Sequence, residues 1–176
     1  MRASSAFTGS SQGGFSLLEA LIAIVIISLG VLGIAGLQLS ALRDTQTSRN
    51  VTAATILARD MADRLRTSAV AVKNFDFNMV PSSVNNCVGP TSSCTEITFF
   101  ASDYAAWRAL VANRLPSGEG RVCRDATPDD GTPAAPACTG GNNDPLVVKV
   151  WWWEKGNQTS TQERFVMPMF ARDGVL

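Results

Sequence analysis

A run of uncharged residues near the N-terminus constrains this chain more than any other feature. From Ala20 to Leu37 there are eighteen consecutive residues without a charge, and almost all of them are apolar. A helix of about 20 such residues is long enough to cross the hydrocarbon core of a bilayer. The run therefore predicts a membrane-spanning helix, with one carboxylate, Glu19, just inside its N-terminal end.

Glu19 needs an explanation, because a carboxylate near hydrocarbon costs on the order of a few kcal/mol unless it is paired, protonated or hydrated. One interpretation places Glu19 at the headgroup level with no further role. In the other, the chain is cut after Gly14, which creates a new α-amino group on Phe15, one helical turn from Glu19. An amine and a carboxylate at the same depth on neighbouring helices can then neutralise each other and fix register.

The segment from Gly14 to Ala20, Gly-Phe-Ser-Leu-Leu-Glu-Ala, resembles the class III signal of type IV pilins and pseudopilins. Four features coincide: the Gly-Phe junction, the glutamate, the apolar run after the junction and a short polar leader before it. The resemblance implies that a prepilin peptidase cuts after Gly14 and methylates the amino group of Phe15. It also implies that Glu19, the fifth residue of the mature chain, serves assembly.

An ordinary secretory signal is the alternative for this segment. Such a signal would be cut after the apolar run, next to small residues such as Gly33-Ile34-Ala35. The helical pattern that continues beyond this point argues against it. Gly30, Gly33 and Gly36 are either ordinary membrane-helix glycines or a soft segment, since each weakens a helix by about 1 kcal/mol relative to alanine.

The helix is expected to continue well beyond the apolar run, from Phe15 to Ser68. No glycine or proline lies between Leu37 and Asn78. Apolar side chains recur at a spacing of three to four residues, which predicts one buried stripe: Ala54, Leu57, Ala58, Met61 and Leu65. We expect a leader at 1–14, a membrane or filament-core half at 15–37 and an amphipathic half at 38–70. The stripe is expected to pack on the chain's own domain; a partner-binding face is the alternative.

Residues 71–176 are expected to form one disulfide-containing α+β domain in the periplasm. Loop composition at 74–95 is followed by a short strand at 96–100 and then a helix with Ser102 or Asp103 as N-cap, ended by Pro116. Three strands are expected: Gly120–Arg124, Leu146–Glu154 and Arg164–Phe170, the last at an edge because of Pro168.

Two details of this domain concern burial. In Trp151-Trp152-Trp153 the first and third side chains share one face of the strand and are expected in the core, whereas the environment of Trp152 stays open. The segment 125–144 is polar and proline-rich, so we expect an irregular exposed loop. Its acids Asp125, Asp129 and Asp130 are expected to be solvated, since their spacing does not match a calcium-binding loop.

The four cysteines are Cys87, Cys94, Cys123 and Cys138. An even number in an exported domain indicates two disulfides, with three pairings open. Sequence neighbours favour Cys87 with Cys94 and Cys123 with Cys138. The spacings do not match those of zinc sites.

The downstream order is similar to that of PilV-type minor pilins. A helix with Trp107 runs into Leu115-Pro116-Ser117-Gly118, and Val148-Lys149-Val150-Trp151 lies in the sheet. The resemblance implies a type IV pilin-like α+β fold, with the long N-terminal helix packed on a small antiparallel sheet. The triple tryptophan departs from that pattern.

The resemblance implies a minor pilin that helps to initiate or cap a type IV pilus and supports twitching motility. It would be held in the inner membrane by one span before it enters the pilus. Implied partners are the prepilin peptidase, other minor pilins, the major pilin and a pilus-tip adhesin. The alternatives are a pseudopilin of a type II secretion system and a membrane-tethered adhesion module that uses the 125–144 loop.

Composition argues against other classes. The formal net charge is zero and there is no basic stripe, so a nucleic-acid partner is not expected. Histidine is absent, and no phosphate-binding loop, nucleophile elbow or metal cluster is visible. We therefore expect neither an enzyme nor a cofactor or metal.

Overall fold

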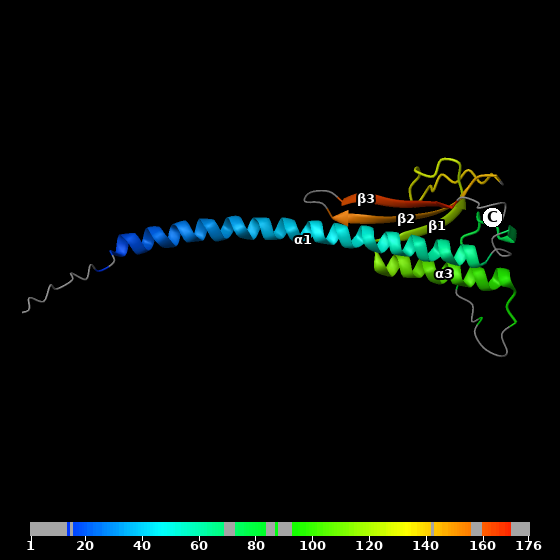
Figure 1. The fold of residues 1–176 in the computed structure, drawn as a ribbon, viewed down its shortest axis with the longest axis horizontal. Helices are drawn as coiled ribbons and strands as arrows, with labels where there is room; N and C mark the ends of the chain where they lie inside the picture. Colours follow the sequence, from blue (N-terminus) through cyan, green and yellow to red (C-terminus); the bar gives the residue numbers. More distant parts are fainter. Residues whose placement is uncertain are drawn as a thin grey trace, which may run out of the picture. The chain divides into compact units, whose positions relative to one another are not determined.

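The chain divides into two compact units at Thr45 and Gln46. The computed structural model describes residue 14 and residues 16–68, 73–83, 87, 93–141, 143–155 and 160–169. The elements with described bounds are, in chain order, the helices α1 Leu17–Thr67 and α3 Glu96–Arg114 and the strands β1 Glu119–Arg124, β2 Leu146–Lys155 and β3 Ser160–Met169 (Figure 1). The fold is the expected α+β, pilin-like architecture.

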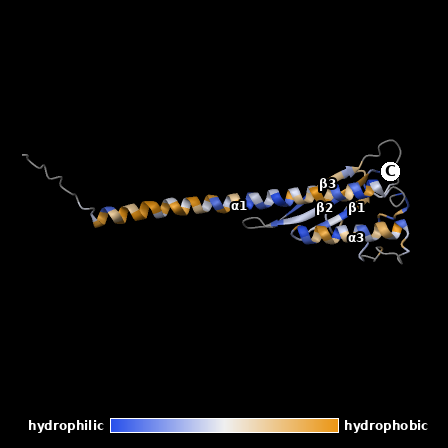
Figure 2. Cartoon of the chain, turned by 60° about the horizontal axis from the view of Figure 1, so that its bottom comes forward, coloured by the Kyte–Doolittle hydropathy of each residue, from blue (hydrophilic) through white to orange (hydrophobic). Residues whose placement is uncertain are grey.

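The first unit consists of the N-terminal part of α1. The helix begins after Ser16, whose hydroxyl oxygen accepts a hydrogen bond from the backbone N–H of Leu18 at 3.3 Å. Figure 2 shows that apolar residues surround this part of the helix, whereas polar and apolar residues alternate in its later turns. The helix therefore lacks a polar face in the segment where the sequence predicted a membrane span, and it becomes amphipathic further along.

The second unit is built on a three-stranded antiparallel sheet in the order β1-β2-β3. In the register, Val122 lies opposite Val148, and Val148 lies opposite Met167. Both outer strands are sheet edges, so the edge position predicted from Pro168 in β3 is confirmed. The observed β3 begins at Ser160, four residues earlier than predicted.

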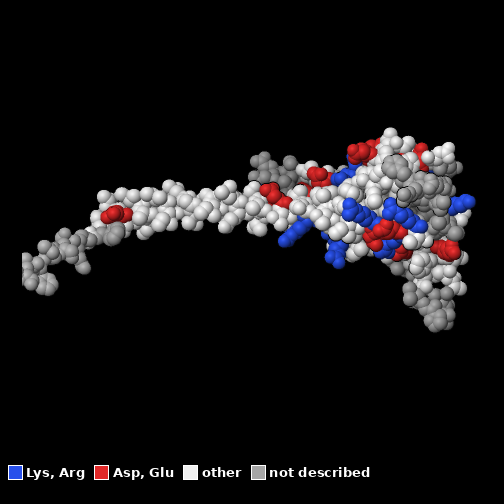
Figure 3. Space-filling view, in the orientation of Figure 1, with Lys and Arg blue, Asp and Glu red and all other residues white. Residues whose placement is uncertain are grey.

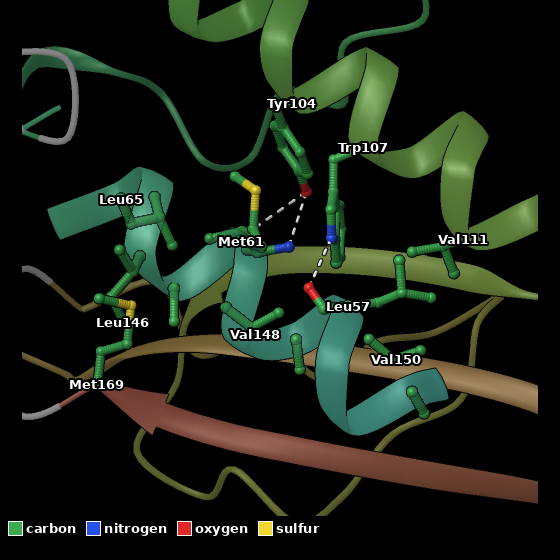
Figure 4. Packing of buried hydrophobic residues seen from close by; sticks show 14 of the residues in the cluster. Leu57, Met61, Leu65, Tyr104, Trp107, Val111, Leu146, Val148, Val150 and Met169 are labelled. Atoms are coloured by element: carbon green, nitrogen blue, oxygen red, sulfur yellow. Dashed lines mark hydrogen bonds between the residues drawn. The ribbon is translucent and has the colours of Figure 1, made fainter. Parts of the chain in front are cut away.

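One face of the sheet packs against α3 and the later turns of α1 (Figure 4). The predicted stripe of α1 is buried throughout, and Leu57 is the most exposed of its residues at 6%. Tyr104 and Trp107 of α3 are also buried. The interpretation of the stripe as a helix face packed on the chain's own domain is therefore confirmed.

α3 begins earlier than predicted, and the expected strand at 96–100 is wrong. β-branched and aromatic residues in this segment favour a strand locally. The hydroxyl oxygen of Thr95 nevertheless accepts a hydrogen bond from the backbone N–H of Thr98 at 3.2 Å, so Thr95 is the N-cap in place of Ser102 or Asp103. Phe100 then continues the buried face of the helix by one more turn.

The opposite face of the sheet is covered by the segment after β1 (Figure 1). This segment is irregular, as expected, but the expectation that all its acids are solvated is wrong for Asp125. The side chains of Asp125 and Lys149 are both completely buried and form an ion pair. Asp129, in contrast, is 92% exposed at its side chain.

The tryptophans of β2 also differ from the prediction. Trp151 and Trp152 are both buried, on opposite faces, because helices cover one face of the sheet and the 125–141 segment covers the other. Trp153, which was expected in the core, is 41% exposed. Both faces of β2 are therefore covered up to Trp152, and the cover ends before Trp153.

Candidate processing and assembly site

The residues that the sequence singled out for processing lie at the start of α1. Gly14 is exposed, and Glu19 is an exposed residue in the first helical turn. The leader residues 1–13 and Phe15, the expected site of methylation, lie outside the described residues. The described part therefore places an accessible glycine and an accessible carboxylate at the two ends of the expected signal.

Glu19 is the only charged residue between Ser16 and Leu42. The face seen in Figure 3 is uncharged along most of this helical stretch, and charges gather on the second unit. A lone carboxylate among apolar side chains cannot be neutralised by its own helix. It therefore requires water, a lipid headgroup or a cation from another molecule.

The large apolar side chains in the N-terminal part of α1 are exposed. From Leu17 to Leu42 the large apolar side chains are 50% to 88% exposed. By length and composition this helix can cross a membrane, and none of the residues in its most apolar segment is buried. Leaving each large apolar side chain in water costs about 1.5–3 kcal/mol relative to burying it. The stretch therefore requires lipid or other apolar helices around it.

Gly30, Gly33 and Gly36 lie within this stretch and remain helical. A Cβ atom added at any of them would meet nothing within 4 Å. The helix therefore has no internal contact that requires glycine at these positions. Any requirement for them would come from helix softness or from close approach of another helix.

Within the second unit, hydrogen bonds and ion pairs fix the later turns of α1 to α3. Trp107 Nε1 donates to the backbone carbonyl of Leu57 at 2.8 Å. Arg64 binds Asp60 at 2.9 Å and also forms an ion pair with Asp103 of α3. Burial opposes the charged form of Arg64, but its two acidic partners outweigh burial and raise its pKa.

A second connection joins the end of β2 to α1. The Glu154 carboxylate accepts hydrogen bonds from Thr47 Oγ1 at 2.6 Å and from Trp152 Nε1 at 2.9 Å. Burial favours the neutral carboxyl, but donors from Thr47, Trp152 and Asn50 outweigh it and lower the pKa of Glu154. No local sequence pattern predicts this contact, because Thr47 and Glu154 are far apart along the chain.

Two disulfides stabilise loops of the second unit. Cys87 is bonded to Cys94, with Cα atoms 5.6 Å apart, and Cys123 to Cys138, with Cα atoms 6.0 Å apart. Cys123 lies in β1, so the second disulfide attaches the covering segment directly to the sheet. Among the residues that the structure describes, no group of three His, Cys, Asp or Glu side chains is placed to hold a metal ion.

Comparison with known families finds a match in the N-terminal segment. Residues 9–35 match the family model described as the prokaryotic N-terminal methylation motif. No curated protein and no solved structure matches the chain. The match covers the Gly14 junction, Glu19 and most of the apolar run, and it supports a type IV pilin-like or pseudopilin protein that carries a prepilin signal.

Proposed function

We propose that the chain is a minor pilin of the PilV type, a structural subunit that helps to initiate or cap a type IV pilus. The observation that carries the proposal is the match to the methylation motif on a helix whose apolar residues are exposed and which continues without a break to Thr67. The order of α3, the Leu-Pro-Ser-Gly turn and the tryptophan-containing β2 favours a minor pilin of this type over other members of the superfamily.

In this proposal the chain has four parts: a leader at 1–14, a membrane or filament-core segment at 15–37, an amphipathic helix at 38–70 and a periplasmic domain at 71–176. Prepilin peptidase would remove the leader and methylate Phe15. The apolar segment would hold the subunit in the inner membrane until it leaves with other minor pilins and the major pilin. Apolar helices that bundle in a fibre keep their side chains away from water, so the transfer conserves their burial.

Glu19 has a specific role in this proposal. Its carboxylate would pair with the methylated amino group of a Phe15 on a neighbouring subunit. The pair would reduce the cost of an isolated charge in an apolar bundle and would select one axial register. The exposure of Glu19 and the lack of other charges up to Leu42 support this role.

The first test is the N-terminus and intact mass of the protein from membranes of cells with and without a prepilin peptidase. The expected product begins at N-methyl-Phe15 only when the peptidase is present. Gly14→Val should block the cut, whereas Gly13→Ala serves as the matched control and should be processed normally. A chain that begins near Gly36 would instead identify an ordinary secretory signal and remove the basis of the proposal.

A second test separates the pilus from a type II secretion system, because the N-terminal motif is shared by both. A deletion strain is scored for twitching motility and for secretion of exoproteins. Loss of motility with normal secretion supports the minor pilin. Loss of secretion with normal motility would identify a pseudopilin.

A further inference from the structure

The buried ion pair beneath the 125–141 segment is an unusual element of this domain. Lys149 lies in the middle of β2, on the face opposite the helices, and its side chain has no exposure. Its neighbours on the same face of the strand are Val147 and Trp151, which are also buried. The lysine amine therefore lies in an apolar environment that excludes water from one side.

The amine is enclosed by oxygen atoms from the covering segment. Lys149 Nζ donates to the carbonyl oxygen of Pro136 at 2.9 Å, to the carbonyl oxygen of Asp130 at 3.2 Å and to Asp130 Oδ1 at 3.1 Å. Asp125 Oδ2 is its ion-pair partner. That oxygen is buried and accepts no hydrogen bond of acceptable geometry, so the amine faces the Asp125 carboxyl group without being aligned as its donor.

The other oxygen of Asp125 is held differently. Asp125 Oδ1 accepts a hydrogen bond from the backbone N–H of Thr127 at 3.0 Å. The hydroxyl of Thr127 also lies between the two acids, 3.4 Å from Asp125 Oδ1 and 2.8 Å from Asp130 Oδ2. A fixed N–H donor on one carboxyl oxygen is the arrangement that stabilises negative charge on that oxygen during attack at the carboxyl carbon.

We propose that Lys149 and Asp125 condense into an intramolecular isopeptide bond, with Asp130 as the carboxylate that relays a proton. The structure holds the groups that this reaction needs: the buried amine, the carboxyl group that it faces, the N–H donor of Thr127 and the second carboxylate. Burial also favours the product, because two charges held out of water are replaced by one neutral amide.

The reaction balances without any further reagent. Asp130 accepts a proton from the Lys149 ammonium, and the free amine attacks Cγ of Asp125 to form the Nζ–Cγ bond. The charge that develops on Oδ1 is held by the N–H of Thr127. The Cγ–Oδ2 bond then breaks, and Oδ2 takes up the two protons lost from nitrogen, one of them through Asp130, and leaves as water. The Asp130 side chain is 44% exposed, so this carboxyl group can exchange protons with solvent.

The bond would join the segment after β1 to the middle of β2. The Cys123–Cys138 disulfide already attaches the same segment to β1. The two links differ in chemistry, since a reductant opens the disulfide and leaves an amide intact. The covering segment would therefore stay attached to the sheet under reducing conditions.

The test is the mass of the full chain, purified from membranes and reduced completely. The expected mass is lower than the mass of the processed sequence by one water, about 18 Da. Lys149→Arg and Asp125→Ala should each show the full mass of their own sequence. A wild-type chain with the full sequence mass would overturn the proposal.

Tryptic digestion locates the bond. The chain from Asp125 to Lys155 contains Lys149 as its only internal cleavage site. Condensation blocks that site, so the expected product is one peptide from Asp125 to Lys155 that has lost one water. Separate peptides that end at Lys149 and begin at Val150 would overturn the proposal. A mass loss with normal cleavage at Lys149 would do so too, because it would identify an internal succinimide, for example at Asp130-Gly131.

The role of Asp130 is tested with a matched pair of variants. Asp130→Asn should leave Lys149 cleavable and restore the full mass, whereas Asp129→Asn, at the adjacent exposed acid, should condense like the wild type. The Cys123–Cys138 disulfide is mapped in the same samples before reduction, so that a misfolded variant is recognised. Normal condensation in a folded Asp130→Asn variant would show that Asp130 takes no part in the reaction.

Discussion

Trp107 of α3 donates its indole N–H to the backbone carbonyl of Leu57, at 2.8 Å, in the interior of α1. The indole also lies over Gly120 of β1, where a Cβ atom would come within 2.5 Å of the ring. One side chain thus contacts the long helix through a hydrogen bond and the sheet through its ring. Removing either contact should loosen the packing between these elements.

Trp107→Phe tests the hydrogen bond. The variant loses the indole donor and part of the ring volume, so we expect the free energy of unfolding of the domain to fall by about 1–3 kcal/mol. Urea unfolding of the full chain in detergent, followed by tryptophan fluorescence, measures the change. Trp153→Phe is the matched control, since Trp153 is 41% exposed, and it should change the unfolding free energy by less than about 0.5 kcal/mol. Equal effects of the two substitutions would contradict the assigned contact.

Gly120→Ala tests the close approach of the ring to β1. The new methyl group cannot be accommodated unless Trp107 moves, so overpacking should cost about 1–3 kcal/mol. Gly36→Ala is the control, because a Cβ atom at that position meets nothing within 4 Å and the domain should keep its unfolding midpoint. The same urea titration compares both variants. An unchanged midpoint in Gly120→Ala would show that the strand can shift away from the ring at no cost.

The elements that make these contacts could be predicted from the sequence where a local pattern specifies them. The stripe that includes Leu57 and Met61 follows from helical periodicity, and the strand around Val148 follows from β-branched and aromatic content. Both are local patterns. The prepilin signal is local as well, so its residues were predicted together.

The buried pair of Lys149 and Asp125 was not predicted, because its formation depends on an irregular segment that folds back over the sheet. No local pattern specifies that path. The only signal was a lysine in the middle of an apolar strand. The same cover explains why Trp151 is buried and why Trp153 is not.

Glu154 predicts a pH dependence of stability. Its pKa is lowered in the folded state by its hydrogen-bond donors, so the contribution is fully present above the unfolded pKa of about 4.5 and is lost as the pH falls through the lower folded value. We expect wild type to be more stable than Glu154→Gln at pH 7, and the difference to shrink below about pH 4.5. Urea midpoints at a series of pH values from neutral to about 3 provide the measurement.

The control for this series is Glu163→Gln, which changes a carboxylate opposite Trp152 on the neighbouring strand. Glu163 lies two residues along β3 from Thr161, the register partner of Glu154, but it does not share the hydrogen bond from Thr47. A constant difference between wild type and Glu154→Gln across the whole pH range would show that the carboxylate charge does not stabilise the contact with α1.

Glu19→Ala tests the proposed assembly role. The substitution removes the only charged side chain between Phe15 and Arg43 and leaves the apolar run intact, so insertion into the membrane should be unchanged. Incorporation into pili should fall, because the amino group of a neighbouring Phe15 loses its partner and register is no longer selected. Membrane fractionation measures insertion, and immunoblots of sheared pili, together with pilus counts, measure incorporation. Leu18→Ala, on the same exposed turn, is the matched control and should assemble normally. Wild-type pilus number and subunit content in Glu19→Ala would remove the assembly role from this carboxylate and leave it as a residue that lies at the membrane surface.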